Sequence, residues 1–499
     1  MGWKTSEIQK LLETSGFKET LKKSLHGLER EGIRVSESGE MSKNSHPCSF
    51  GSALTNPYIS TDFSESQLEL ITPPFKTEQG AIDYLKEIES YVQKHLQNEY
   101  IWSPSMPAIL PSKECDIPLA VYGDSEESKK KTLYREGLGK RYGRRMQMIS
   151  GIHYNFSFTK EFWEKLHTKM DPHRDLQKFI DDSYMGIMRN FLRISWLDVY
   201  LFGSSPAIDK TYLKSPKAPL KKLGKRTYFA PYGTSLRMSQ FGYCCAVQAE
   251  LTVSHNSLKE YIEDLQKAIS SPYSKYKKYG KSQLNDSYLQ IPNEYYSPIR
   301  AKQHVGLNDD ILDKLGKKGI KYIELRSGDL DVFSPCGVDI EQMYFFHIMV
   351  VYLLTQPATR LTKDEQKSCA KNHDRTALYG RKSGLELKRK GKNIGLKKWG
   401  LKEVKGMLPV ANLLDDIHGT NRYTQNINAQ MEKLVDPKRT PSAVVLSILK
   451  TEKLEFTEFG IKRTMENSKF YEVVKIHKET EARFKKAAKT SFREKDLLE

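Results

Sequence analysis

The sequence predicts an α+β fold, in which a mainly antiparallel sheet from about residues 1–335 is buttressed by helices from about residues 336–499. Short segments in the first part alternate polar and apolar residues, as half-buried strands do. Beyond Pro335 apolar residues recur at helical spacing almost to the end of the chain. Because no repeat, low-complexity linker or composition shift divides the 499 residues, we expect a single domain, 1–499.

The elements of the first part follow from local patterns. Helical spacing of apolar residues opens the chain, and turn-forming residues separate the strands that follow. A loop-rich region is expected at 100–150, where prolines are frequent. We predict strands at 32–35, 68–72, 151–158, 228–229, 288–291 and 320–326, and helices at 79–96 and 181–201.

The helical part contains the most apolar stretch of the chain, Met343 to Leu354. This stretch is shorter than the roughly 20 residues that cross a bilayer, and it includes His347, so we predict a buried core helix at 339–355. Charged helices are expected at 397–415 and 458–487. Without a signal-like N-terminus or a spanning helix, we expect a cytoplasmic protein with no membrane partner.

The charge balance leaves two readings open. Lysine and arginine number 80 against 62 acidic residues, a net charge of +18, and such an excess is found in nucleic-acid-binding proteins. The basic clusters, however, are widely separated along the chain, which favours a solvated basic surface and no nucleic-acid partner. The six cysteines, including the adjacent pair Cys244 and Cys245, lack the spacing of a disulfide framework or a zinc site, so we expect reduced thiols.

Acidic residues lie inside segments that otherwise resemble strands. Residues two apart on a strand share a face, so Glu29 and Glu31 project together, as do Glu324 and Arg326. Burying a carboxylate is costly unless a cation or hydrogen-bond donors compensate it. Together with Asp62 and Glu69, these residues predict a site for hard cations and phosphates.

His153 lies in a cleanly alternating strand, on the same face as Asn155. On spacing alone a hydrogen-bonded core histidine is the commoner interpretation, and a metal ligand is the alternative. The sequence has no P-loop and no dinucleotide-binding glycine motif, so a nucleotide would be held by the carboxylate face and by arginines such as Arg326. A salt bridge between Arg326 and Glu324 is the structural alternative for that arginine.

Nine motifs, in sequence order from about residue 25 to about residue 340, resemble the proteobacterial-type glutamate–cysteine ligase family. They are G-L-E-R-E, T-D-F-S-E-x-Q-L-E-L-I-T-P, W-S-P-S-M-P, T-L-Y-R-E-G-L-x-x-R-Y-G, Q-x-I-S-G-I-H-Y-N-F-S, L-F-G-S-S-P-A, T-S-L-R-M-S, N-E-Y-Y-S-P-I-R and Y-I-E-L-R-S. The resemblance implies a glutamine-synthetase-like fold, with a curved, mainly antiparallel sheet forming a funnel for ATP and Mg²⁺. Mn²⁺ is an alternative metal.

The resemblance also implies a reaction and the residues that perform it. The γ-carboxylate of L-glutamate attacks the γ-phosphate of ATP, and the amine of L-cysteine displaces phosphate from the γ-glutamyl phosphate, giving γ-glutamylcysteine, the first intermediate of glutathione biosynthesis. Arg326 would contact the transferring phosphate, and Arg237 would bind glutamate. The implied metal ligands are Glu29, Glu31, Asp62, Glu69, His153 and Glu324, and the implied cysteine pocket comprises Tyr134, Arg135, Tyr243 and Tyr296.

Two alternatives stay open beside this interpretation. One is a glutamate ligase with another amine acceptor, and the other, which the motifs disfavour, is a basic nucleic-acid-binding protein. The tyrosines, taken without their motifs, are more typical of sheet edges and cores. We expect a monomer, and no local motif identifies the residues that would hold adenine.

Overall fold

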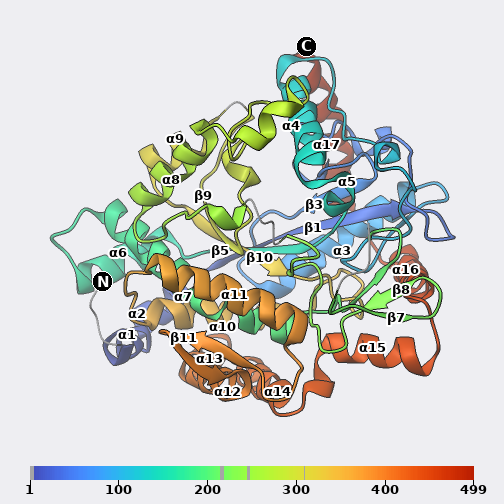
Figure 1. The fold of residues 1–499 in the computed structure, drawn as a ribbon. Coiled ribbons are helices and arrows are strands. Elements are labelled where there is room, and N and C mark those ends of the chain that lie inside the picture. Colours follow the sequence, from blue (N-terminus) through green and yellow to red (C-terminus); the bar gives the residue numbers. More distant parts are fainter. Residues whose placement is uncertain (1–4, 214–217, 244–247, 308, 499) are drawn as a thin grey trace.

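The computed structural model describes residues 5–213, 218–243, 248–307 and 309–498, and its centre is an antiparallel sheet (Figure 1). Within these residues seven strands form the sheet in the order β2-β3-β1-β5-β10-β9, and β4 pairs with β1. The strands are β1 (Leu25–Val35), β2 (Ile59–Thr61), β3 (Gln67–Ile71), β4 (Tyr100–Ile101), β5 (Ile152–Ser157), β9 (Ile299–Lys302) and β10 (Tyr322–Gly328).

Strand pairing brings the acidic positions together. Glu31 of β1 lies opposite Glu69 of β3, and Glu29 lies opposite His153 of β5. On the far side of β5, Glu324 of β10 lies opposite Arg300 of β9. We call the face that carries Glu29 and Glu31 the front face of the sheet, and the opposite face the back face.

Helices α3 (Glu78–His95) and α10 (Ile340–Thr355) pack on the back face. The buried guanidinium of Arg30, from β1, pairs with Glu89 of α3, and Tyr154 of β5 stacks on Phe346 of α10 with ring centroids 5.4 Å apart. Every residue of α10 from Gln342 to Thr355 is buried, which confirms the predicted core helix. Among the described residues, no helix combines the length and apolarity needed to cross a membrane.

Two further helices pack beside the sheet and against α10 or each other. The 27-residue helix α7 (Leu176–Phe202) contacts β9 and β10, and α11 (Lys363–Tyr379) packs along it. Figure 1 shows α7, α10 and α11 as a layer beside the sheet, with α12, α13 and α14 beyond them. Asp175 and Thr362 cap the N-termini of α7 and α11 by accepting backbone N–H bonds, as short polar side chains commonly do.

The remaining elements surround this framework. The helices are α1 (Thr5–Leu12), α2 (Ser15–Leu21), α4 (Glu126–Tyr142), α5 (Arg144–Gln147), α6 (Lys160–Met170), α8 (Leu258–Ser270), α9 (Ile311–Lys318), α12 (Leu396–Gly406), α13 (Leu408–His418), α14 (Arg422–Val435), α15 (Pro441–Thr451), α16 (Phe456–Val473) and α17 (Lys478–Asp496). Two small antiparallel sheets comprise β6 (Ala207–Asp209), β7 (Lys221–Leu223) and β8 (Thr227–Phe229), and β11 (Glu386–Arg389) with β12 (Lys392–Gly395).

The predicted fold class is confirmed, and the errors are local. The strand predicted at 288–291 is wrong, because its backbone N–H groups do not form a strand ladder: Tyr288 and Leu289 donate to carbonyls at the end of α8, and Gln290 donates to the Glu294 side chain. The region expected to be loop-rich contains α4, a helix without an apolar face that periodicity could reveal. The hairpin β11–β12 and the breaks that divide each long C-terminal helix in two were also not predicted.

Four cysteines are described, and all are free thiols, as expected. Cys48 and Cys115 are exposed, whereas Cys336 and Cys369 are buried. The adjacent cysteines at positions 244 and 245 lie outside the described residues.

Candidate active site

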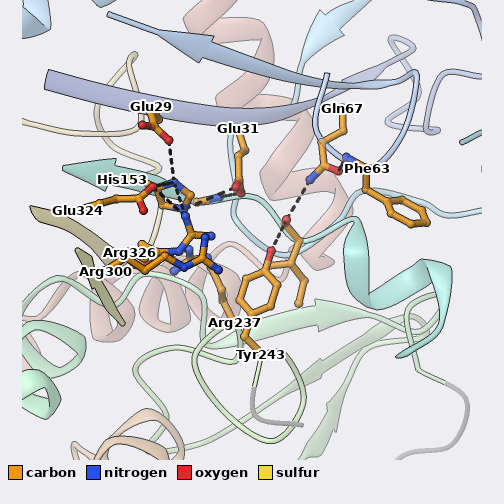
Figure 2. A network of polar contacts seen from close by, with 12 residues as sticks. Glu29, Glu31, Phe63, Gln67, His153, Arg237, Tyr243, Arg300, Glu324 and Arg326 are labelled. Atoms are coloured by element: carbon orange, nitrogen blue, oxygen red, sulfur yellow. Dashed lines mark hydrogen bonds and ion pairs between the residues drawn. The ribbon is translucent and has the colours of Figure 1, made fainter. Parts of the chain in front are cut away.

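The predicted metal ligands gather on the front face. His153 is the centre of the group: its Nδ1 lies 3.5 Å from Glu29 Oε2 and 3.5 Å from Glu324 Oε1, and its Nε2 lies 3.6 Å from Glu31 Oε1. Figure 2 shows these side chains pointing toward one another from three adjacent strands. Donor atoms of Glu29, His153 and Glu324 all lie within 4.8 Å of one another, a spacing that could hold a metal ion.

Hydrogen bonds fix the carboxylates of β1. Asn155 Nδ2 donates to Glu29 Oε1 at 2.8 Å, and the backbone N–H of Gly151 donates to Glu31 Oε2 at 2.8 Å. Both donors come from the segment around β5, so strand pairing itself orients the two acids. The remaining carboxylate oxygens stay available for a cation.

Three carboxyl groups on this face repel one another. Burial and the nearby Asp62 raise the pKa of Glu31 to about 8. Burial, followed by Glu29, Asp62 and Glu31, raises the pKa of Glu69 well above its usual value, and burial also raises the pKa of Asp62. These carboxyl groups cannot all be ionised without a counter-charge. They therefore favour a bound cation, because a positive charge between them removes the repulsion.

Glu324 has the opposite environment. Although burial opposes ionisation, Arg326 and Lys302 hold its pKa well below the usual value. Arg326 Nη1 lies 2.8 Å from Glu324 Oε1, and Lys302 Nζ lies 3.4 Å from Oε2. The salt bridge considered for Arg326 is therefore present, and the same guanidinium also lines the cavity in front of the sheet.

His153 is neutral at physiological pH. Burial and then Arg326 lower its pKa to about 4. A neutral imidazole keeps a lone pair for a metal ion, so the environment of His153 fits the ligand interpretation.

Arg237 comes from a loop after β8 and is almost fully buried. Its Nη2 donates to the backbone carbonyl of Arg326 at 2.9 Å, and its Nη1 lies 4.0 Å from Asp329 Oδ1. Its guanidinium also lies over the Tyr243 ring, 5.3 Å from the centroid. Its Nε has no hydrogen-bond partner in the described part of the chain, so a donor is left for a ligand.

A cavity of about 540 Å³ opens in front of these groups. Glu31, Asp62, His153, Arg237 and Arg326 line it; Glu29 and Glu324 do not, but they contact the lining residue His153, and Glu69 lies opposite Glu31 in the sheet. The four residues predicted for the cysteine pocket also line the cavity: Tyr134, Arg135, Tyr243 and Tyr296. The structure thus brings all the predicted site residues to one place.

We call Tyr134, Tyr243 and Tyr296 the tyrosine wall of the cavity. Hydrogen bonds hold two of these tyrosines to the segment before β5. Tyr243 donates to the carbonyl of Ile149 at 3.0 Å, and Gln147 Nε2 donates to the Tyr296 hydroxyl at 3.1 Å. The two rings are 5.2 Å apart. Arg135, on α4, donates to the backbone carbonyl of Asp62 and so ties this wall to the acidic face.

Sequence reasoning missed the cations of β9. Arg300 lines the cavity and donates to the carbonyls of Asn293 and Tyr295, both at 2.6 Å, while Lys302 pairs with Glu324. The alternating R-A-K at the end of N-E-Y-Y-S-P-I-R-A-K places both basic residues on one face, and this was the available signal. Helix α11 also lines the cavity, through Gln366, Lys367 and His373 among others, and no local motif indicated it.

Known proteins resemble this chain over almost its whole length. The family model for glutamate-cysteine ligase matches residues 9–376. A glutamate–cysteine ligase from Pseudomonas fluorescens is 38% identical over 488 residues, covering 96% of this chain and 91% of that protein, and one from Azotobacter vinelandii is 37% identical with similar coverage.

Solved structures agree. The glutamate–cysteine ligase of Francisella tularensis, determined in complex with AMP, has a TM-score of 0.90 and 32% identity, covering 95% of this chain and 94% of that one. A bifunctional glutathione synthetase from Pasteurella multocida has a TM-score of 0.74 and 27% identity, covering 93% of this chain and 55% of that one. With the motifs, the acidic front face and the full-length similarity in agreement, the chain belongs to the glutamate–cysteine ligase family.

Proposed function

We propose that the chain joins the γ-carboxylate of L-glutamate to the amine of L-cysteine with ATP, giving γ-glutamylcysteine, ADP and phosphate, the first step of glutathione biosynthesis. The observation that carries the proposal is a surplus of buried carboxylates beside arginines at a cavity, in a member of this family. AMP in the Francisella structure supports a nucleotide as co-substrate. Because both α11 and the sheet line the cavity, we treat residues 1–499 as one catalytic unit.

The front face fits Mg²⁺, with Mn²⁺ as an alternative. The donors are carboxylate oxygens and one neutral imidazole, and the raised pKa values of Glu31 and Glu69 reflect repulsion that a cation would remove. The residues that would hold the metal are Glu29, Glu31, Asp62, Glu69, His153 and Glu324. When bound, the metal would neutralise phosphate oxygens of ATP and orient the terminal phosphate.

The chain's own cations account for the phosphoryl transfer. The glutamate γ-carboxylate attacks the γ-phosphorus, the bond to the ADP oxygen breaks, and γ-glutamyl phosphate forms. Arg326, held by Glu324 at the cavity wall, donates N–H groups to the transferring phosphoryl oxygens. Arg237, whose Nε has no partner among the described residues, binds the glutamate and steadies the acyl phosphate in the second step.

The tyrosine wall receives the amine acceptor. A small thiol amino acid favours an apolar aromatic pocket with a few polar anchors, and Tyr134, Tyr243 and Tyr296 with Arg135 provide that combination. The amine attacks the acyl carbon and phosphate leaves. A ligase that uses another amine would need the same acidic face. The choice of amine therefore depends on these tyrosines.

The test is ADP release by the purified protein with ATP and Mg²⁺, comparing glutamate alone, cysteine alone and both together, with the product mass recorded. We expect turnover that requires both amino acids and yields γ-glutamylcysteine. ADP release that depends on glutamate and on a different amine would change the acceptor. No turnover in any mixture would refute the ligase. The monomeric state, the cytoplasmic location and the absence of a nucleic-acid partner stay predictions.

A further inference from the structure

A second group of histidine and carboxylate side chains lies on the back face of the sheet, on the other side of β1 from the candidate active site. His26 of β1, Glu78 in the first turn of α3 and His347 in the middle of α10 are 1%, 3% and 1% exposed. Their donor atoms lie within 4.8 Å of one another, and the His26 and His347 rings are 4.8 Å apart. We call these three residues the back-face triad.

The hydrogen bonds of the triad determine which nitrogen of His347 carries a proton. His347 Nδ1 lies 2.7 Å from Glu78 Oε1, and the Tyr423 hydroxyl donates to the same oxygen at 2.9 Å. Since an ionised carboxylate can only accept, the proton of His347 is on Nδ1. In the neutral imidazole Nε2 then carries the lone pair, and this atom is buried with no partner among the described residues.

A fourth imidazole is close by. His418, at the end of α13, has its ring 6.4 Å from that of His347, and its Nε2 is also buried without a described partner. Leaving a buried polar atom without a partner is unfavourable, so two such nitrogens on neighbouring imidazoles call for an explanation, and a bound ion is one.

The protonation states of His26 and Glu78 are compatible with a metal ion at this place. Burial lowers the pKa of His26 to about 3, so its imidazole is neutral. The Glu78 carboxyl has a lowered pKa despite its burial, because His26 and His347 lie beside it, so it carries the negative charge. Neutral imidazoles and one carboxylate are the forms in which these side chains bind metals.

We propose that the back-face triad binds a divalent transition-metal ion of the Zn²⁺ class, with the His418 imidazole available as a further ligand. Imidazole-rich sites with a single carboxylate select Zn²⁺ and its transition-metal neighbours, whereas Mg²⁺ requires mainly oxygen ligands. Because the ligands come from the sheet and from helices α3, α10 and α13, the ion would clamp the helical layer to the strand that carries Glu29 and Glu31.

The experiment loads untagged full-length protein with Zn²⁺ in the presence of excess Mg²⁺, removes free metal by desalting and measures bound zinc by mass spectrometry. Excess Mg²⁺ competes for the carboxylates of the front face, and His153→Asn reports any zinc that this face still holds. We expect about one zinc per chain in the wild type, and a Tm that rises with zinc. His26→Asn and His347→Asn should lose the zinc, whereas His153→Asn, the matched substitution on the front face, should keep it.

A spectroscopic measurement covers the case in which the back-face variants do not fold. Co²⁺ bound to the wild type should give the intense visible bands of a tetrahedral nitrogen and oxygen site, unchanged by excess Mg²⁺ and by His153→Asn. His418→Asn, at a half-buried position, should weaken Co²⁺ binding without unfolding the protein. The proposal is overturned if the wild type retains no zinc and shows no such bands, or if folded His26→Asn and His347→Asn retain zinc as the wild type does.

Discussion

The two faces of the central sheet both gather histidines and carboxylates, and they differ in how the charges are balanced. On the front face Glu31, Asp62 and Glu69 have raised pKa values from burial and crowding, beside a cavity. On the back face two carboxylates have close partners: Glu89 Oε1 lies 3.1 Å from Arg30 Nε, although burial still raises the pKa of Glu89 to about 7, and Glu78 accepts from His347 and Tyr423.

This difference separates catalysis from structure. Uncompensated acids beside a cavity store repulsion that a metal and its phosphate ligand can relieve, whereas compensated acids in a closed core hold elements together. Strand β1 contributes to both, because alternate residues point to opposite faces: Glu29 and Glu31 to the front, His26 and Arg30 to the back. Substitutions on the front face should therefore lower the rate of catalysis, and substitutions on the back face should lower the free energy of unfolding.

The largest expected effect is on the front face. Glu29→Gln keeps the shape of the side chain but removes a ligand charge next to His153, so we expect kcat/KM to fall by about 10³-fold, the scale of losing a principal charge-stabilising group in phosphoryl transfer. The Tm should stay close to that of the wild type, because the change also removes repulsion with Glu324. The exposed control Glu37→Gln should leave both unchanged. Wild-type turnover in Glu29→Gln would contradict the metal assignment.

The second largest effect is expected on the back face, where a substitution should lower stability and leave activity unchanged. Glu89→Gln leaves the Arg30 guanidinium buried without its counter-charge, and breaking a buried pair in this way costs about 3–5 kcal/mol of unfolding free energy. Denaturant unfolding above pH 7, where Glu89 with its pKa of about 7 is mostly ionised, should show that loss, while kcat of the folded enzyme stays close to the wild-type value.

The control for this change removes both charges. The double variant Arg30→Met with Glu89→Leu should recover most of the stability, since apolar side chains of similar volume can replace a buried pair. A large drop in kcat in folded Glu89→Gln would show that the two faces are not separable.

Much of the front face could be predicted from the sequence, because its signal is local. Acids two residues apart in a strand pattern reveal a shared face, as for Glu29 with Glu31, and the pattern around His153 gives its face as well. The motifs then supplied the cysteine-pocket tyrosines, which alternation alone could not distinguish from core residues. The antiparallel sheet and the buried α10 followed from the same two periodicities.

What could not be predicted depends on long-range register. Lys302 meets Glu324 only because β9 pairs with β10 in one particular register, and nothing in the four residues of β9 specifies that partner. His26, Glu78 and His347 are far apart in the chain, and each resembles an ordinary core or helix residue by itself. Helix α4 was missed because its own residues are polar on all sides, so it has no apolar stripe to reveal it. Its position depends on tertiary contacts such as that of Arg135 with Asp62.

Metal binding should release protons from the front face and not from the back. With a pKa of about 8, Glu31 is mostly protonated at pH 7 without metal, and a bound cation lowers that pKa and expels the proton. Mg²⁺ affinity should therefore increase as the pH rises from 7 to 8. Zn²⁺ on the back face would meet a His26 that is already neutral at pH 7, because its pKa is about 3.

Calorimetric titration in two buffers of different ionisation enthalpy measures the protons released. We expect a fraction of a proton up to about one per chain for Mg²⁺, and close to none for Zn²⁺ with Mg²⁺ present. Equal proton release for the two metals would mean that they compete for the same carboxylates.

The smallest expected effect concerns the wall that belongs to neither face. Tyr296 lies on the loop before β9, and its hydroxyl accepts from Gln147 where it lines the cavity. Tyr296→Phe removes the hydroxyl that we propose contacts cysteine, and one hydrogen bond to it is worth about 1 kcal/mol, so KM for cysteine should rise about fivefold with little change in kcat or in KM for ATP. The control is Tyr232→Phe, because Tyr232 is an exposed tyrosine that does not line the cavity. If Tyr296→Phe instead raised KM for ATP, the acceptor and the nucleotide would share this wall, and the division of labour between the acidic sheet face and the aromatic loops would have to be redrawn.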